Sequence, residues 1–341
     1  MTPRRNVRSF VRVHRVGTLI VAATAVFAIP SVTRAQSEWR PKLELDNDVY
    51  NFWQRHTRRP DEEYTNGVHV LLESWTAPWW GRRLAPEVSD CASGTFASCR
   101  STTLSLGQDL YTPHLDRTPH AVDGWQLERP YFAWLYLSAS ARVTSATALS
   151  ATTMAVGVTG PPAGGAMAQR VAHRIGFNEP ATGWQTQIGF EPGVLLGWRR
   201  AALLMRGGEP RGPGFDLAPE IATSLGNIRT SAGAGGTARI GWNLSHPWHP
   251  PAWKGRAAAE WWVTAGARAE YVARDMSLDG TLHRPTRRVD RVPGVTQYEF
   301  GAAVRARGVT LEYRAVTRSR EYRTGPAHHT YSSMSIALTP P

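Results

Sequence analysis

Apolar and polar residues alternate along most of the chain, in runs of about ten residues. The alternation is clearest from position 261, where Trp261, Val263 and Tyr271 fall on one face and Arg268 and Glu270 on the other. Successive side chains of a strand point to opposite faces, so this pattern predicts strands with one apolar and one polar face.

The alternating runs predict about twelve strands, and bacterial outer-membrane barrels have an even number. The expected strands lie near 41–50, 64–75, 101–111, 131–143, 150–159, 184–199, 214–224, 229–243, 257–275, 294–307, 308–320 and 330–339. With the N-terminus in the periplasm, the outer connections are 51–63, 112–130, 160–183 and 276–293. The segment 76–100 is then periplasmic.

Alternation alone fits both a soluble sandwich and a membrane barrel. Tryptophans near the expected strand ends favour the barrel, because amphipathic rings gather at membrane interfaces. These are Trp39, Trp75, Trp79, Trp80, Trp184, Trp198, Trp261 and Trp262. Barrel closure also satisfies the backbone polar groups in lipid. We therefore expect an all-β fold, an antiparallel transmembrane β-barrel.

One outer connection breaks the alternation. Residues 166–175 read as a short helix in which Met167, Val171 and Ile175 form an apolar ridge. Gln169 and His173 are also four residues apart and share a different face. We expect the helix to dock by its ridge and to present His173.

The first 35 residues are expected to be a secretory signal peptide, leaving residues 36–341 as the barrel domain. An arginine-rich start precedes an apolar stretch, 17–30, that is too short to span a membrane as a helix, and 33–35 (TRA) fits a cleavage site. A retained N-terminal anchor is the alternative. Removing the six arginines of this segment lowers the formal charge from +12 to +6.

The remaining arginines are scattered rather than gathered in one run, which argues against a nucleic-acid partner. The basic side chains are almost all arginine. Guanidinium groups suit bidentate phosphate contacts such as those of lipopolysaccharide, and genomic base composition explains the same bias equally well. Export makes a small disulfide loop between Cys91 and Cys99 plausible, as a staple without chemistry.

Four clusters could carry chemistry. Residues 46–48 (DND) end the first expected strand, 64–67 (YTNG) begin the second, and Gln169 with His173 and then Glu179 follow in the third outer connection. Oxygen ligands suit a hard cation such as Ca²⁺, and a neutral imidazole can activate water. Together they would suit metal-assisted ester hydrolysis.

Each cluster also has an ordinary structural interpretation. Asp-Asn-Asp and Asn-Gly are common turn sequences, and a lone histidine is more often a surface or packing residue. Regular pleating sends Asn47 and Asp48 to opposite faces, so a shared site needs a bulge or a backbone carbonyl. Nucleophile-elbow, zinc-protease and nucleotide-binding motifs are absent from the sequence.

The ordered motifs resemble the lipid A 3-O-deacylase (LpxR-like) outer-membrane family. The matching blocks are 45–48 (LDND), 61–67 (DEEYTNG), 107–113 (GQDLYTP), 129–136 (RPYFAWLY), 157–161 (GVTGP), 169–173 (QxxxH) and 183–187 (GWxxQ). They occur in family order over 43–187, and sparser similarity covers the rest of the chain.

The resemblance implies a twelve-stranded barrel in the bacterial outer membrane that needs Ca²⁺. It implies hydrolysis of the 3′-linked acyloxyacyl chain of lipid A by activated water. His173 is then the general base. The residues that hold metal, water and carbonyl are Asn47, Asp48, Thr65, Gln169 and Glu179, with Asp48, Glu179 and Thr65 on the metal.

Two positions depart from the family pattern. A basic pair that would contact a lipid A phosphate reads Asp116-Arg117 here, so Arg117 remains as the cation, and Val49 replaces a second acid after Asp48. The expected partners are lipid A or lipopolysaccharide and outer-membrane lipids, and we expect a monomer. The alternatives are a non-enzymatic barrel, acting as a pore or a surface-binding protein, and a phospholipid esterase.

Overall fold

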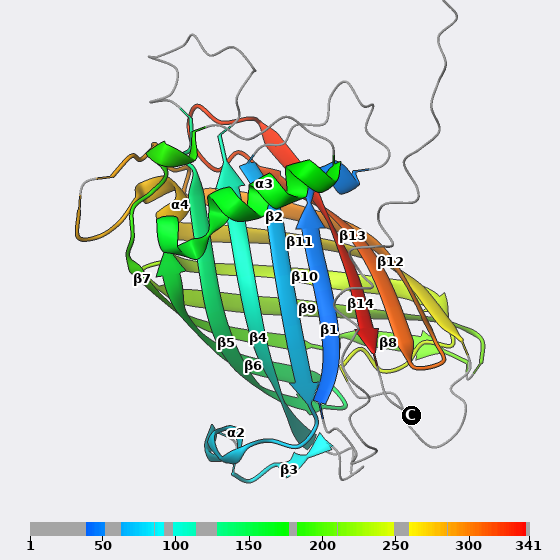
Figure 1. The fold of residues 1–341 in the computed structure, drawn as a ribbon. Coiled ribbons are helices and arrows are strands. Elements are labelled where there is room, and N and C mark those ends of the chain that lie inside the picture. The colour runs from blue at the N-terminus through cyan, green and yellow to red at the C-terminus, as the bar shows by residue number, and fades with distance from the viewer. Residues whose placement is uncertain are drawn as a thin grey trace, which may run out of the picture.

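The chain forms a closed antiparallel β-barrel of twelve strands, shown in Figure 1. The computed structural model describes residues 39–51, 63–84, 86–91, 98–113, 128–176, 183–209, 211–248, 259–284 and 286–338. The barrel strands are β1 (Trp39–Asn47), β2 (Glu63–Ser74), β4 (Ser98–Thr112), β5 (Phe132–Ser145), β6 (Ala148–Thr159), β7 (Pro192–Ala202), β9 (Pro213–Gly226), β10 (Arg229–Trp242), β11 (Glu260–Asp275), β12 (Gly294–Ala306), β13 (Val309–Ser319) and β14 (His328–Leu338). The expected signal peptide lies outside the described residues.

Each barrel strand pairs with its neighbour in the chain, and β14 pairs with β1 to close the barrel. Two short strands, β3 (Ser89–Asp90) and β8 (Met205–Gly208), pair with β4 and β9 outside this circle. The helices are η1 (Asp48–Tyr50), α2 (Trp79–Leu84), η5 (Pro161–Ala163), α3 (Gly165–Gly176), η6 (Trp184–Thr186) and α4 (Met276–Asp279). None of them, in the described part of the chain, is long and apolar enough to cross a membrane.

The alternating pattern produces the two faces that the sequence predicts. Leu137, Val263 and Phe300 are exposed on the outward face, as a lipid-facing band requires. The opposite side chains line a polar lumen, where Arg239 pairs with Asp216 at 2.5 Å and Arg305 with Glu260 at 3.0 Å.

The two ends of the barrel differ. Figure 1 shows α3 and α4 at one end, the α3 end, and α2 with β3 at the other, the α2 end. The connections expected outside the cell lie at the α3 end where they are described, and the segment expected in the periplasm lies at the α2 end. There Cys91 and Cys99 form a disulfide beside the β3–β4 pairing.

Two details of the sequence prediction are wrong. The sixth strand begins at Pro192 rather than at 184, because Trp184 opens a 3-10 turn instead of a strand. The tryptophans are also not all interfacial. Trp79 and Trp261 are exposed, whereas Trp184 is buried and Trp262 lies in the lumen beside Arg239 and Arg305.

Candidate functional site

The first part of the candidate site is the α3 end of β1. Asn47 is the last residue of the strand and Asp48 opens the 3-10 turn η1, so pleating does not continue through Asp48. Asn51 holds the turn, since its side-chain amide donates to the Thr330 carbonyl at 2.7 Å and its backbone N–H donates to the Asp48 carbonyl at 3.3 Å. The Asp48 side chain is 0% exposed.

The second part is a β-bulge in β2. The pairing of β2 with β4 shifts register between Tyr64 and Asn66, which leaves Thr65 as the extra residue. The Thr65 and Thr112 hydroxyl oxygens are 2.5 Å apart in a buried hydrogen bond. The bulge therefore turns the Thr65 hydroxyl towards Thr112. Thr112 lies an even number of residues from the exposed Leu106 on β4, so both side chains point to the outward face.

Four residues at the α3 ends of neighbouring strands are register partners, and we call them the rim row. Asn47 pairs with Asn66, Asn66 with Leu110, and Leu110 with Ala133. Asn66 lies an even number of residues from the exposed Leu72 on β2, and so does Leu110 from the exposed Leu106 on β4, so the members of each pair share a face. The rim row therefore faces outward rather than into the lumen.

Helix α3 packs against one end of the rim row. Ala166 and Ala168 contact a buried cluster that contains Leu110, Ala133 and Trp184. The preceding turn is fixed as well, because the Gln108 amide donates to the Ala163 carbonyl at 2.6 Å. The helix therefore lies on the outward face of the barrel wall.

The helix is long enough to cover the whole rim row. Its 12 residues span about 18 Å, while four neighbouring strands span about 14 Å. Figure 1 shows α3 crossing the ends of β4, β2 and β1. From its contacts with Leu110 and Ala133, the helix therefore runs towards the ends of β2 and β1.

The face that α3 presents to the wall differs from the expectation. Met167 and Val171 of the expected docking ridge are 66% and 51% exposed, and the Ile175 side chain lies outside the described part. The alanine face docks instead. In lipid, apolar side chains gain nothing by turning inward, whereas small residues allow close packing.

Gln169 and His173 occupy different surroundings on α3. Gln169 is buried, and its side-chain oxygen accepts a 2.5 Å hydrogen bond from the Trp184 indole N–H. Because the oxygen of the amide accepts this bond, the NH₂ group of the same amide can donate to another acceptor. His173 is half-buried one turn later on the same face of the helix. Glu179 and Arg117 lie outside the described residues.

The sequence model of one protein family, described as outer membrane protein LpxR, matches residues 18–339. The chain belongs to this family. Among solved structures, LpxR from Salmonella typhimurium is similar in fold, with a TM-score of 0.69 and 22% identity, over 88% of this chain and 99% of that chain. The family and the barrel fold together place this LpxR-family protein in the bacterial outer membrane.

Other solved barrels are much less similar to this LpxR-family chain. The β domain of the Bordetella autotransporter BrkA has a TM-score of 0.43 at 9% identity, over 88% of this chain and 97% of its own. The translocator domain of NalP from Neisseria meningitidis has a TM-score of 0.36 at 10% identity, over 88% and 86%. Neither bears on function. No curated protein sequence matches the chain.

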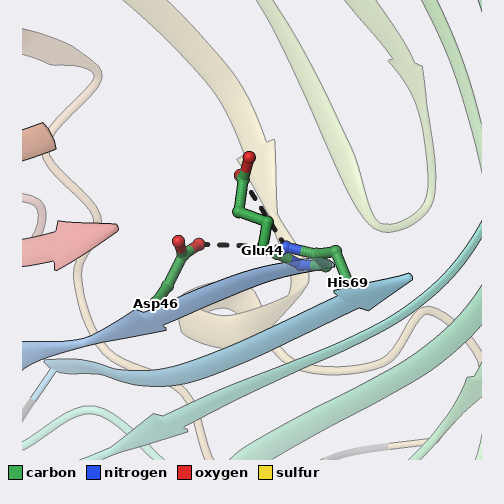
Figure 2. A group of neighbouring side chains, drawn as sticks. All are labelled: Glu44, Asp46 and His69. Carbon is green, nitrogen blue, oxygen red and sulfur yellow. Dashed lines mark ion pairs between the residues drawn. The ribbon is translucent and has the colours of Figure 1, made fainter. Parts of the chain in front are cut away.

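The LpxR-family chain also has a polar cluster in its lumen that the sequence analysis missed. Figure 2 shows Glu44 and Asp46 of β1 beside His69 of β2. Glu44 and Asp46 are two residues apart on one strand face, and His69 is the register partner of Glu44. The two acids at this spacing were a visible signal, but their approach to His69 depends on the strand register.

A buried charge network lies at the α3 end of the barrel. Arg129 pairs with Glu63 at 3.0 Å and Glu321 at 3.4 Å, and the Tyr322 hydroxyl donates to Glu63 at 2.7 Å. Burial alone would raise the pKa of Glu321, but Arg129 and Arg318 outweigh it and hold the pKa below its usual value. The network ties β2 to the connections before β5 and after β13.

Proposed function

We propose that this LpxR-family protein is an esterase that removes the 3′-linked acyloxyacyl chain from lipid A. The observation that carries the proposal is the outward position of the rim row under α3. A site on the outward face borders the lipid, whereas a lumen site would be separated from it by the barrel wall. Lipid acyl chains can therefore reach the groups on α3 without leaving the membrane.

The donor set at the α3 end suits calcium. Asp48 contributes a buried carboxylate, Asn47 an amide and Thr65 a hydroxyl, which are the oxygen types that Ca²⁺ prefers. In the proposed site, Glu179 supplies a second carboxylate. Bound Ca²⁺ would polarise the ester carbonyl and stabilise the negative charge that develops on it.

The proposed chemistry of the chain's own residues centres on α3. His173 accepts a proton from a water molecule while the oxygen of that water attacks the ester carbonyl carbon. It then gives the proton to the leaving alkoxide. The oriented amide of Gln169 donates a hydrogen bond to the carbonyl oxygen or to the water. Arg117 contacts a lipid A phosphate.

The test uses the purified full-length protein in detergent with lipopolysaccharide, and separately with phospholipid. We expect Ca²⁺-dependent release of fatty acyl chains from lipopolysaccharide and not from phospholipid. His173→Ala should lower kcat by about 10²- to 10⁴-fold, the usual contribution of a general base. His283→Ala is the matched control, because His283 is an exposed histidine of another connection at the same end.

Three outcomes would reject parts of the proposal. Acyl release from phospholipid alone would move the substrate to phospholipid. Full activity of the His173→Ala protein would remove the assigned base. No release from either lipid, together with ion conductance in planar bilayers, would favour a pore.

A further inference from the structure

The lumen cluster of Glu44, Asp46 and His69 has the layout of a cation site. One carboxylate oxygen from each acid and Nδ1 of His69 lie within 4.8 Å of one another. Figure 2 shows both carboxyl groups on the same side of the imidazole ring as this nitrogen. The cluster faces the lumen, on the opposite side of the wall from the rim row.

The other ring nitrogen of His69 is fixed by a third acid. Nε2 lies 2.8 Å from Oδ1 of Asp109 on β4, so it donates its hydrogen to that carboxylate. A carboxylate behind a ligating imidazole is a common arrangement at metal sites, because it sets the tautomer and the ring orientation.

A neutral imidazole does not fit this environment. With the hydrogen on Nε2, the lone pair of Nδ1 points at two carboxylates. With the hydrogen on Nδ1, the lone pair of Nε2 faces Asp109. Both arrangements are repulsive, so His69 requires a positive charge at Nδ1, either a proton or a metal ion.

The distances favour a metal ion over a proton. Oε1 of Glu44 and Oδ2 of Asp46 lie 4.0 and 3.9 Å from Nδ1, beyond hydrogen-bond range for an N–H donor. A cation with bonds of about 2.0–2.2 Å joins donors at this separation with small side-chain movements. Asp46 is also 6% exposed. Its Oδ2 accepts a 2.8 Å hydrogen bond from the Tyr64 hydroxyl, whereas Oδ1 has no hydrogen-bond partner, so Oδ1 is the oxygen that a rotation of the carboxylate would offer to a ligand.

We propose that the barrel lumen binds a zinc-class divalent cation through His69 Nδ1, Asp46 and Glu44, with Asp109 orienting the ring. A nitrogen ligand with two carboxylates suits Zn²⁺ or Co²⁺, whereas Ca²⁺ prefers oxygen ligands throughout. Lys42 at 2.7 Å and Arg314 at 3.3 Å already pair with Glu44. Glu44 is therefore the weakest of the three ligands.

A cavity of about 210 Å³ adjoins the cluster at His69, on the side of Asp109, and four tyrosines and Arg318 complete its lining. A bound cation would join β1 to β2 directly and to β4 through Asp109. These strands carry Asn47 and Thr65 at their ends, so the ion would stiffen the wall beneath the rim row.

The experiment measures metal binding by the untagged full-length protein, refolded in detergent and stripped with a chelator. We expect one equivalent of Co²⁺ to give the visible absorption of a low-symmetry nitrogen–oxygen site, and Zn²⁺ to displace it. Excess Ca²⁺ should not displace it. Asp109→Asn should weaken Zn²⁺ binding by about 10- to 100-fold, as loss of a carboxylate behind a ligating histidine usually does.

Variants locate the ion. His69→Gln and Asp46→Asn should abolish the Co²⁺ absorption, while Asp48→Asn, which belongs to the proposed calcium site, should retain it. Heat-modifiable migration checks that each variant folds. Failure of the wild-type protein to take up Co²⁺ or Zn²⁺ would mean that Nδ1 holds only a proton, and the proposal would be wrong. Loss in Asp48→Asn but not in His69→Gln would place the ion at the outward site and also overturn it.

Discussion

At the scale of single residues, the candidate site depends on two local departures from regular strand geometry. The 3-10 turn at Asp48 ends the alternation that would have separated Asn47 from Asp48, and the bulge at Thr65 turns its hydroxyl towards Thr112. Both departures lie at the ends of neighbouring strands. They release Asp48 and Thr65 from the alternation of their strands, as the proposed outward site requires.

Asp48 is expected to set the calcium requirement of the proposed esterase. Asp48→Asn removes a charged oxygen ligand, and the charge of the ligands tunes Ca²⁺ affinity. We expect the Ca²⁺ concentration for half-maximal acyl release to rise by about tenfold or more, with activity partly restored by excess Ca²⁺. Glu312→Gln, on the lumen face of β13, serves as the control acid. An unchanged calcium requirement in Asp48→Asn would contradict the assignment.

Glu321 is expected to make the barrel sensitive to acid. Its folded pKa lies below the usual value of 4.5, so the ionised carboxylate stabilises the folded chain above that pH. This contribution is lost as the pH falls through the lowered pKa. The urea midpoint of unfolding, followed by tryptophan fluorescence from pH 7 to pH 3, should fall steeply below 4.5.

Glu321→Gln provides the comparison. Removing one partner of a buried ion pair costs about 3–5 kcal/mol, so the variant should be less stable at pH 7. It should also lose less additional stability on acidification than the wild-type protein does. Equal acid dependence of the two proteins would assign the acid sensitivity to other groups.

At the scale of elements, α3 is held by its small residues. A Cβ atom on Gly165 would lie 2.5 Å from the Trp184 ring and 2.7 Å from Ala133. The helix therefore approaches the wall as closely as it does because glycine and alanine face it. The exposed Met167 and Val171 extend the apolar outward surface of the barrel over the helix.

Gly165→Val is expected to displace α3 and to lower activity without unfolding the barrel. A shift of about 1 Å in a catalytic group can reduce the rate by about 10²-fold. The measurement is acyl release together with heat-modifiable migration. Met167→Ala changes an exposed side chain two residues away and should leave the rate near that of the wild-type protein. Normal activity of Gly165→Val would show that the helix position is not critical.

The disulfide lies at the end of the barrel remote from α3 and should affect local stability only. Replacing both Cys91 and Cys99 by serine removes the constraint on a short loop beside β4, which contributes at most about 3 kcal/mol. We expect faster protease cleavage near α2 and unchanged acyl release. A loss of activity comparable to that of His173→Ala would contradict this separation of the two ends.

The sequence predicts the elements better than their contacts. All twelve barrel strands were expected, because alternation over about ten residues is a local signal. The start of β7 was placed too early, because the buried packing of Trp184 is decided by α3. The helix was expected at 166–175, but its docking face was wrong, because a hydrophobic ridge does not indicate the interior when the surroundings are lipid.

At the scale of the whole molecule, closure of the barrel creates two separate chemical environments. The lumen is polar and rich in ion pairs, and it includes the Glu44, Asp46 and His69 cluster. The outward face carries a band of exposed apolar side chains such as Leu137, Val263 and Phe300, and the rim row and α3 lie at one end of it. The lumen cluster could not be predicted because it depends on strand register, which a local pattern does not specify.

The proposed function requires that the outward site at the α3 end deacylates lipid A. The most direct measurement is the mass spectrum of lipid A from bacteria that produce the wild-type protein or His173→Ala, grown with Ca²⁺. We expect lipid A lighter by one acyloxyacyl chain with the wild-type protein and unchanged lipid A with the variant. Identical spectra for the two, with both proteins folded in the outer membrane, would contradict it.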